Sequence, residues 1–356
     1  MNSRIELIRV AVVDDSALMR RLITAALSGA PDITVVGSAC DANEARELIR
    51  ASDPDVVTLD VAMPGMNGLD FLRKIMELRP TPVIMVSNLT AEGADTSVNA
   101  LQIGAIDVVQ KPQGKEGMEK FGALLQSKVR LAASARPTLE KRRVAGIPGP
   151  RTALARPAAF SRGLIAIGAS TGGVGALTKL LTSLPDGLPP IMIVQHMPKG
   201  YPERFAARLR VELGRDIAEA RPDETLVAGM IRIAPGDLHL RVVRRGGGIQ
   251  SELEDSDPVT GHRPSVDVLF ESVARSIGAK AMGVILTGMG RDGATGLAAM
   301  RRAGAVCLGQ DRDSSVVWGM PRAALEMNAL DEEVSIDTMP QRILHHLTAV
   351  RRDGGA

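Results

Sequence analysis

The feature that most constrains this chain is a repeated alternation between short apolar runs and stretches of helical periodicity. The helical stretches, such as 16–27 and 43–49, carry apolar residues three or four positions apart. This alternation predicts βαβ units, and therefore parallel sheets covered by helices on both faces. The predicted strands are 8–13, 33–36, 56–59, 83–86 and 106–109 in the first half, and 164–167, 191–194, 231–234 and 281–286 in the second.

The chain is long enough for two such domains, since it has 356 residues against about 100–200 for a typical domain. Segment 134–160 interrupts the alternation with four prolines and six basic residues against one acid. We therefore predict two doubly wound α/β domains, at 1–133 and 161–350, joined by a linker at 134–160. The alternating stretch 238–243, followed by Gly246–Gly248, predicts a small antiparallel hairpin on the second domain.

Composition and charge narrow the possible partners and the compartment. A formal net charge of +2 and 2% aromatic residues give no reason to expect a nucleic-acid partner. No stretch approaches the roughly 20 apolar residues of a membrane span, so we expect no direct membrane insertion. Cys40 and Cys307 lie far apart without metal-type spacing, which favours a reducing compartment. The expected location is the cytoplasm.

Polar residues follow the predicted strands of the first half: Asp14 and Asp15, then Asp60, Ser87 and Lys111. The carboxyl ends of parallel strands meet at one edge of a sheet, so these side chains are expected to cluster. Three carboxylates would repel one another unless a hard cation such as Mg2+ neutralised them. Asp60 stands alone on the central strand, and we predict it to be the nucleophile toward phosphorus.

This pattern resembles the receiver domain of two-component response regulators, over about residues 7–130. The matching features are the Asp14-Asp15 pair, Leu59-Asp60, the Met63-Pro64-Gly65 turn with Gly68, the hydroxyl of Ser87 and the Lys111-Pro112 pair. The resemblance implies that the domain is phosphorylated, with Asp60 as the site of phosphorylation.

The resemblance also implies roles for the surrounding residues. Asp15 and Asp60 would hold Mg2+ together with the backbone carbonyl of Ala62, and Asp14 would assist. Ser87 and Lys111 would bind the acyl phosphate. Many receivers carry an aromatic switch residue just before this lysine, where this chain has Val108.

A serine lies in a glycine-rich turn in the second half. Gly168-Ala169-Ser170-Thr171-Gly172 is a G-x-S-x-G pattern directly after a predicted strand. Small neighbours allow a tight strand-to-helix turn that exposes the serine hydroxyl. Glycine-rich turns of this kind also cradle phosphates, so the pattern alone leaves both functions open.

A histidine and an aspartate follow two other predicted strands. His196 comes after strand 191–194, and Asp292 follows strand 281–286. A parallel sheet can bring both to the edge that carries Ser170, where His196 would accept the serine proton and Asp292 would orient the imidazole. The chain order Ser, His, Asp differs from that of α/β-hydrolases, and a dinucleotide site lacks its third glycine.

The second half, about residues 161–350, resembles the CheB family of chemotaxis methylesterases. The matching motifs are Gly168–Gly173, Gln195–Pro198, Ile233–Asp237, His262–Asp267, Leu286–Gly293 and Gly319–Pro321. The resemblance implies hydrolysis of γ-methyl esters on glutamates of methyl-accepting chemotaxis receptors, with deamidation of receptor glutamines as a second activity and a chemotaxis histidine kinase as phosphodonor. It implies no cofactor for the esterase reaction.

Backbone N–H groups of Thr171 and Met289 are the expected donors to the oxyanion in such a reaction. Two other functions stay open at this point. The chain could be a receiver-controlled binding module whose second domain is not catalytic, or an esterase or deamidase acting on a different modified protein. The intact set of Ser170, His196 and Asp292 favours catalysis.

Overall fold

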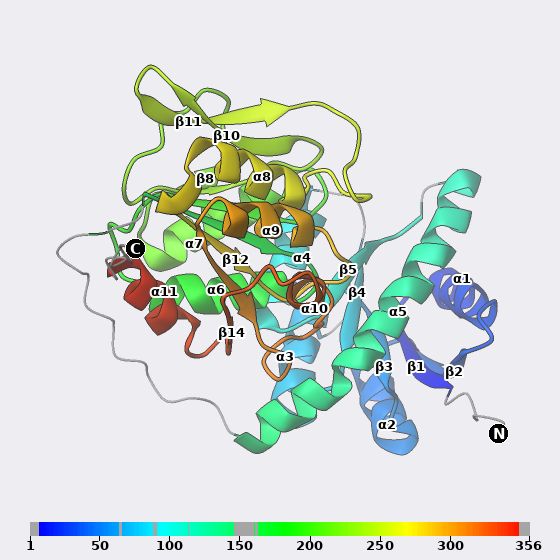
Figure 1. Cartoon of the computed structure of the whole chain (residues 1–356). Helices are drawn as coiled ribbons and strands as arrows, with labels where there is room; N and C mark the ends of the chain where they lie inside the picture. Colours follow the sequence, from blue (N-terminus) through cyan, green and yellow to red (C-terminus); the bar gives the residue numbers. More distant parts are fainter. Residues whose placement is uncertain are drawn as a thin grey trace. The chain divides into compact units, whose positions relative to one another are not determined.

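The structure, a computed structural model, describes residues 7–63, 66–87, 91–112, 114–145, 160 and 163–348. It divides into two compact units, residues 1–147 and 148–356. Each unit contains a parallel sheet with helices packed against it (Figure 1). The predicted fold class of two doubly wound α/β domains is thereby confirmed. Pro64 and Gly65 of the predicted turn lie outside the described residues.

The first unit holds a five-stranded sheet in the order β2-β1-β3-β4-β5, and every strand pair in it is parallel. Its elements are β1 (Ile8–Val13), α1 (Ala17–Ser28), β2 (Ile33–Ala39), α2 (Ala42–Ser52), β3 (Val56–Asp60), α3 (Gly68–Leu78), β4 (Val83–Ser87), α4 (Ala91–Ile103), β5 (Asp107–Gln110) and α5 (Gly114–Ala145). All five predicted strands are present, and β3 is the central strand. Every residue of β3 and β4 is buried, as both faces of a parallel sheet require.

Polar side chains define where the helices of this unit begin. Ser16 accepts a hydrogen bond from Met19 N at the start of α1, and Asn67 accepts one from Leu69 N at the start of α3. At α2, the Asp41 carboxylate accepts from the backbone N–H groups of Asn43 and Glu44. Such caps satisfy donors that have no partner within the helix.

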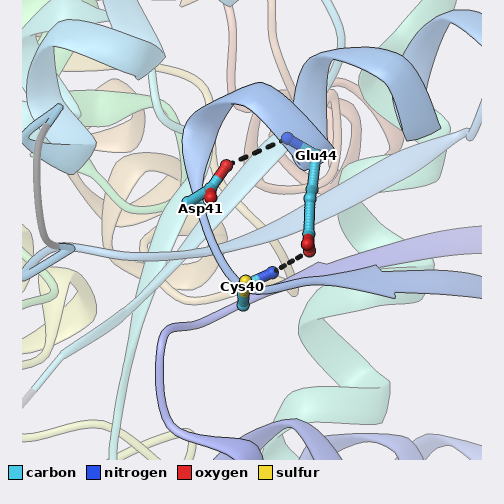
Figure 2. Close-up of side chains that lie close together, drawn as sticks. All are labelled: Cys40, Asp41 and Glu44. Atoms are coloured by element: carbon cyan, nitrogen blue, oxygen red, sulfur yellow. Dashed lines mark hydrogen bonds between the residues drawn. The ribbon is translucent and has the colours of Figure 1, made fainter.

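Cys40, Asp41 and Glu44 lie together at the start of α2 and have the donor types of a metal site (Figure 2). Their contacts account for the grouping in another way. The Glu44 carboxylate accepts a hydrogen bond from Cys40 N, while Asp41 caps Glu44 N, in the manner of a capping box. The hydrogen bond to Glu44 also raises the pKa of the Cys40 thiol, which disfavours the thiolate that a metal would need.

The second unit holds a seven-stranded parallel sheet in the order β14-β13-β12-β6-β7-β9-β8, and a separate two-stranded sheet. Its elements are β6 (Leu164–Ala169), α6 (Gly173–Ser183), β7 (Ile191–Gln195), α7 (Tyr201–Leu213), β8 (Ile217–Glu219), β9 (Ile231–Ile233), β10 (His239–Arg245), β11 (Gly248–Glu254), α8 (Val266–Ser276), the 3-10 helix η1 (Gly278–Lys280), β12 (Ala281–Ile285), α9 (Ala294–Arg302), β13 (Val306–Gln310), α10 (Met320–Glu326), β14 (Glu332–Val334) and α11 (Met339–Thr348).

The two-stranded sheet is the predicted hairpin. Strands β10 and β11 pair antiparallel, and β10 lies against α8 (Figure 1). Two serines of α8 bind β10 through hydrogen bonds. Ser272 accepts one from Val242 N, and Ser276 donates one to Val242 O. The hairpin therefore steadies α8, whose first residues contribute to the site described below.

Helix α5 differs from the prediction. It continues to Ala145, so twelve residues of the segment predicted to be a linker, 134–145, are helical. Alanine, arginine, lysine, leucine and glutamate dominate this stretch, and all are good helix formers, so propensity outweighs the proline at position 137. The domain limits of the sequence analysis stay predictions. No helix among the described residues is both long and apolar enough to cross a membrane.

Gly68 offers a test of how tightly the β3–α3 connection is packed. A Cβ at this position would lie 2.2 Å from Asp60 O and 2.8 Å from Val61 O. Gly68→Ala should therefore destabilise the first unit by about 1–3 kcal/mol, because backbone must move to admit the methyl group. Scanning calorimetry of the full chain would detect this as a lowered transition temperature.

Gly122→Ala is the matched control. Gly122 lies inside α5, where an added Cβ would stand 3.7 Å from the Ala26 Cβ, an ordinary contact. That change should raise stability by up to about 1 kcal/mol through helix propensity alone. Equal effects of the two substitutions would contradict the packing argument for Gly68.

Candidate functional site

The acidic residues of the first unit meet where the strand order changes direction, between β1 and β3. Asp14 is fully buried and Asp60 is 3% exposed, and a carboxylate oxygen from each lies within 4.8 Å of one from Asp15. Lys111 Nζ lies 2.9 Å from Asp14 Oδ2 and 3.0 Å from Asp60 Oδ2. Four of the predicted residues thus form one cluster.

The negative charge of this cluster is only partly balanced by Lys111. Burial raises the pKa of Asp60, and nearby Asp14 adds to the rise, against the lowering effect of Lys111 and of a hydrogen bond from the backbone of Ala62. Burial alone would lower the pKa of Lys111, but its contacts with Asp14 and Asp60 outweigh burial and raise it. One lysine among three carboxylates leaves room for a hard divalent cation with oxygen ligands, so the residues present fit Mg2+.

Ser87 ends β4 and is 1% exposed. Its hydroxyl lies 3.1 Å from the hydroxyl of Ser97 in α4. The Ser97 hydroxyl also donates to Gly93 O at 2.6 Å. The predicted phosphate ligand is therefore linked to α4 through a buried hydrogen bond.

The predicted nucleophile, base and orienter of the second unit follow its three central strands. Ser170 follows β6, His196 follows β7 and Asp292 lies in the loop after β12. These strands are neighbours in the order β12-β6-β7, and β6 is the strand from which the sheet grows in both directions. Crevices at such a switch point are where open α/β sheets place their functional groups.

Asp292 and His196 are joined directly. His196 Nε2 lies 2.8 Å from Asp292 Oδ2, and the aspartate is fully buried. An ionised carboxylate can only accept, so Nε2 carries the proton and Nδ1 is the nitrogen left to act as a base. Nδ1 is buried and has no hydrogen-bonding partner in the described part of the chain.

Ser170 and His196 leave adjacent strands side by side. Ala169 pairs with Gln195 in the sheet, and His196 N donates a hydrogen bond to Ala169 O at 3.1 Å. No hydrogen bond joins the Ser170 and His196 side chains among the described residues. Catalytic contacts of this kind are often long before substrate binds, so the arrangement is compatible with proton transfer from Ser170 to His196.

The N-terminus of α8 holds Asp292. Val266 N donates to Asp292 Oδ2 at 2.8 Å, Asp267 N donates to Oδ1 at 3.1 Å, and the Ser265 hydroxyl donates to Oδ1 at 2.7 Å. Burial would raise the pKa of Asp292, but the hydrogen bonds from His196, Ser265 and Val266 outweigh burial and hold it below its usual value. Asp292 is thus an anion over a wide pH range, suited to orienting an imidazole rather than to exchanging protons.

The glycines of the G-x-S-x-G pattern have specific spatial reasons. A Cβ on Gly168 would lie 2.2 Å from Val266 Cγ1, so glycine lets α8 approach β6 closely enough to reach Asp292. Gly172 has φ +75°, a conformation that favours glycine, and a Cβ there would lie 2.6 Å from Val316 Cβ. Both glycines serve the turn around Ser170.

The predicted oxyanion donors belong to two different loops, after β6 and after β12. Thr171 is 4% exposed and follows Ser170 directly, while Met289 is 46% exposed and follows Gly288. A Cβ on Gly288 would lie 2.7 Å from Ser170 Cβ, so this loop passes directly against the nucleophile. Gly288 O accepts hydrogen bonds from Gly319 N and Met320 N, which fix the loop. The donor roles of Thr171 and Met289 remain predictions.

Sequence reasoning missed three residues that support this site. Gln195 Nε2 donates to Ser170 O at 2.9 Å and to His196 O at 3.2 Å. Ser265 binds Asp292, as described above. The His262 ring stacks on the His196 ring, with centroids 3.8 Å apart and planes 10° from parallel. Gln195, Ser265 and His262 all fall within the motifs of the family resemblance, which was the only signal that pointed to them.

Comparisons with known proteins match each unit to a known family. Residues 165–343 match the family model described as CheB methylesterase, and residues 10–121 match the Response regulator receiver domain. A protein-glutamate methylesterase/protein-glutamine glutaminase 1 of Caulobacter vibrioides is 52% identical over 348 residues, which is 97% of this chain and 99% of that protein. One from Salmonella typhimurium is 47% identical over 344 residues, covering 96% and 97%.

A solved structure resembles the second unit. The crystal structure of the Thermotoga maritima CheB methylesterase catalytic domain is 33% identical, with a TM-score of 0.51. The match covers 52% of this chain and 98% of that one.

Asp267 provides a test of the electrostatics around Asp292. Burial raises the pKa of Asp267 and the Asp292 charge adds to the rise, although Gly296 N and the Thr260 hydroxyl donate to its oxygens. Ionised Asp267 therefore costs stability at neutral pH. Asp267→Asn removes the charge and leaves an oxygen for Gly296 N, so the unfolding temperature at pH 7 should rise by a few degrees, as a gain of about 1 kcal/mol would produce.

The sign of the pH dependence follows from the raised pKa. The folded pKa lies above the unfolded value of about 3.9, so wild type loses stability relative to the variant as pH rises from that value through the folded pKa. Below pH 3 the two proteins should unfold at similar temperatures. The assignment would be contradicted if the stability of Asp267→Asn relative to wild type were lower at pH 7 than at pH 3.

Proposed function

Because the chain belongs to the CheB methylesterase family, we propose that it is a protein-glutamate methylesterase and protein-glutamine glutaminase controlled by phosphorylation of its receiver domain. Its substrates would be methyl-esterified glutamates and certain glutamines of chemotaxis receptors, and a chemotaxis histidine kinase would supply the phosphoryl group. The observation that carries the proposal is the buried contact between His196 and Asp292 beside Ser170, at the switch point of the second sheet. With both cysteines free and these partners, the proposed location is the cytoplasm.

The esterase reaction would run by acyl transfer to Ser170. His196 Nδ1 accepts the hydroxyl proton as Ser170 Oγ attacks the γ-carbonyl carbon, and the imidazolium is held through Nε2 by Asp292. The same proton then passes to the methoxy oxygen, and methanol leaves. Water adds to the acyl-enzyme with His196 again as base, which releases glutamate and restores the serine. With a glutamine substrate, ammonia takes the place of methanol.

The oxyanion that forms at the γ-carbonyl needs donors that are already in place. We assign this role to the backbone N–H groups of Thr171 and Met289, supported by the loop that Gly288 holds against Ser170. In a well-studied protease, one such donor contributes about 2.7–4 kcal/mol to transition-state stability. The Met289 side chain, 46% exposed beside the nucleophile, would face the substrate.

In the receiver domain, Asp60 would be the phosphoacceptor. Asp15 and Asp60, with the backbone carbonyl of Ala62 and with Asp14 assisting, would hold Mg2+, and the cation would supply charge neutralisation at the phosphoryl oxygens. Lys111, already 3.0 Å from Asp60, would pair with the acyl phosphate. Ser87 would exchange its hydrogen bond with Ser97 for one to the phosphate, so α4 would sense phosphorylation even with Val108 in place of an aromatic switch residue.

Replacing the nucleophile tests the mechanism. Ser170→Ala should lower the rate of methanol release from methylated receptor membranes by at least about 10³-fold, because a serine nucleophile has no substitute in such a relay. Circular dichroism should show an unchanged fold, since Ser170 contributes only its backbone to hydrogen bonds among the described residues. Ser183→Ala, in the last turn of α6, is the matched control and should keep full activity. Full activity in Ser170→Ala would exclude the mechanism.

Phosphorylation can be tested separately. A small phosphodonor with Mg2+ should label wild type once, and Asp60→Ala should abolish the label because Asp60 is the acid that ends the central strand and pairs with Lys111. Chelation of Mg2+ should suppress labelling of wild type. Asp70→Ala, an exposed acid of α3 paired with Arg73, is the control and should be labelled normally. Undiminished labelling of Asp60→Ala would refute the assignment.

A further inference from the structure

His262 lies on the face of the imidazole that we assign as the base. The two rings are parallel within 10°, with centroids 3.8 Å apart, which is van der Waals contact over the whole ring. The mechanism above gives His262 no role, because the Ser170, His196 and Asp292 relay is complete without it.

The orientation of His196 needs more than its contact with Asp292. A single hydrogen bond at Nε2 leaves the ring free to rock about the bond, which would swing Nδ1 away from the serine. Nδ1 itself has no hydrogen-bonding partner among the described residues, so no second hydrogen bond prevents this motion. A flat ring stacked at contact distance does prevent it, since tilting His196 would drive its edge into His262.

His262 is held rigidly enough to act in this way. Val259 and His262 exchange two backbone hydrogen bonds of 3.1 and 3.0 Å across a two-residue turn. The central residues Thr260 and Gly261 have φ +54° and +79°, which is the pattern of a type I′ turn. The Thr260 hydroxyl donates to Asp267 Oδ2, so the turn is anchored to the first turn of α8.

The same short segment thus serves both partners of the relay. Residues 265–267 supply three hydrogen bonds to Asp292, and residue 262 supplies the surface against which His196 rests. We propose that His262 is a positioning residue for the esterase reaction, which fixes the plane of the His196 imidazole so that Nε2 meets Asp292 and Nδ1 is presented to Ser170. This inference rests on the proposed function, and it adds a residue to its machinery.

Stacking also suits the charge that the reaction creates. His196 becomes an imidazolium after each proton transfer from serine or water, and a neutral aromatic face favours a cation beside it. A flat aromatic ring is therefore what position 262 requires, and an aliphatic side chain of similar size would supply bulk without that face.

The test compares His262→Phe with His262→Leu in the full chain. The leucine variant should lose about 10- to 100-fold in kcat, the range that a small misplacement of a catalytic group produces, while KM stays within about twofold. The phenylalanine variant keeps a flat aromatic ring and should stay within about threefold of wild-type kcat. His262→Gln, of similar size without a ring, should behave like His262→Leu and replaces it should the leucine variant not fold. His345→Leu, an exposed histidine of α11, is the control and should have wild-type kcat.

Two results would overturn the proposal: a phenylalanine variant as impaired as the leucine variant, or a loss that falls mainly on KM, which would make His262 a substrate-binding residue. A readout without substrate separates this inference from the proposed function. Nitrogen-15 shifts of the His196 ring should show the proton on Nε2 in wild type and in His262→Phe, and a mixture of Nε2–H and Nδ1–H forms in His262→Leu. Unchanged shifts in His262→Leu would also contradict the proposal, whereas absence of methanol release by wild type would count against the function alone.

Discussion

The second unit depends on one interaction, the placing of the Asp292 carboxylate at the N-terminus of α8. A buried anion is costly unless hydrogen bonds and charge compensate it, and here two backbone N–H groups, the Ser265 hydroxyl and His196 do so. The helix in turn has no cap from its own Ser265 side chain, so Asp292, in the loop after β12, supplies the missing acceptor. The loop that carries Asp292, helix α8 and the His196 imidazole therefore stabilise one another. The glycine at position 168 makes this possible, because a side chain there would push α8 away from β6.

Both units place buried carboxylates at the switch point of a parallel sheet, yet they compensate them differently. Asp292 is saturated by fixed donors, which lower its pKa and leave it unreactive. Asp60 has Lys111 and a carboxylate neighbour, and burial raises its pKa. An aspartate whose negative charge is only partly compensated can exchange its partners. It can leave the lysine to bind a cation and then form a bond to phosphorus. The difference between an orienting aspartate and a phosphoaccepting one thus lies in how many fixed donors surround it.

The parts of this structure that periodicity controls were predictable, and those that depend on tertiary contact were not. The apolar runs located the strands around Asp60, Ser170 and His196, because parallel strands buried on both faces are apolar throughout. The short edge strands β8 and β14 carry no such signal, and the buried interior strand β13 was not predicted either. His262 is one residue of a polar turn in the sequence, and only the fold of residues 259–267 brings it to His196. The choice of Nδ1 as the base likewise depends on which nitrogen meets Asp292.

Two glutamine side chains continue the hydrogen bonding of the sheet past the last backbone pairs of β7 and β13. Gln195, the last residue of β7, donates to the carbonyls of Ser170 and His196, so it ties the nucleophile's strand to that of the base. Gln310, the last residue of β13, accepts from Thr287 N and joins β13 to the loop after β12. Gln195 leaves Oε1 buried without a partner among the described residues, at a cost of about 1–3 kcal/mol. Its neighbour must be glycine, since a Cβ on Gly173 would lie 2.0 Å from that oxygen. In return for this cost, the glutamine contacts stiffen the carboxyl-terminal edge of the sheet. A stiff edge holds a serine, an imidazole and a carboxylate from three strands in register.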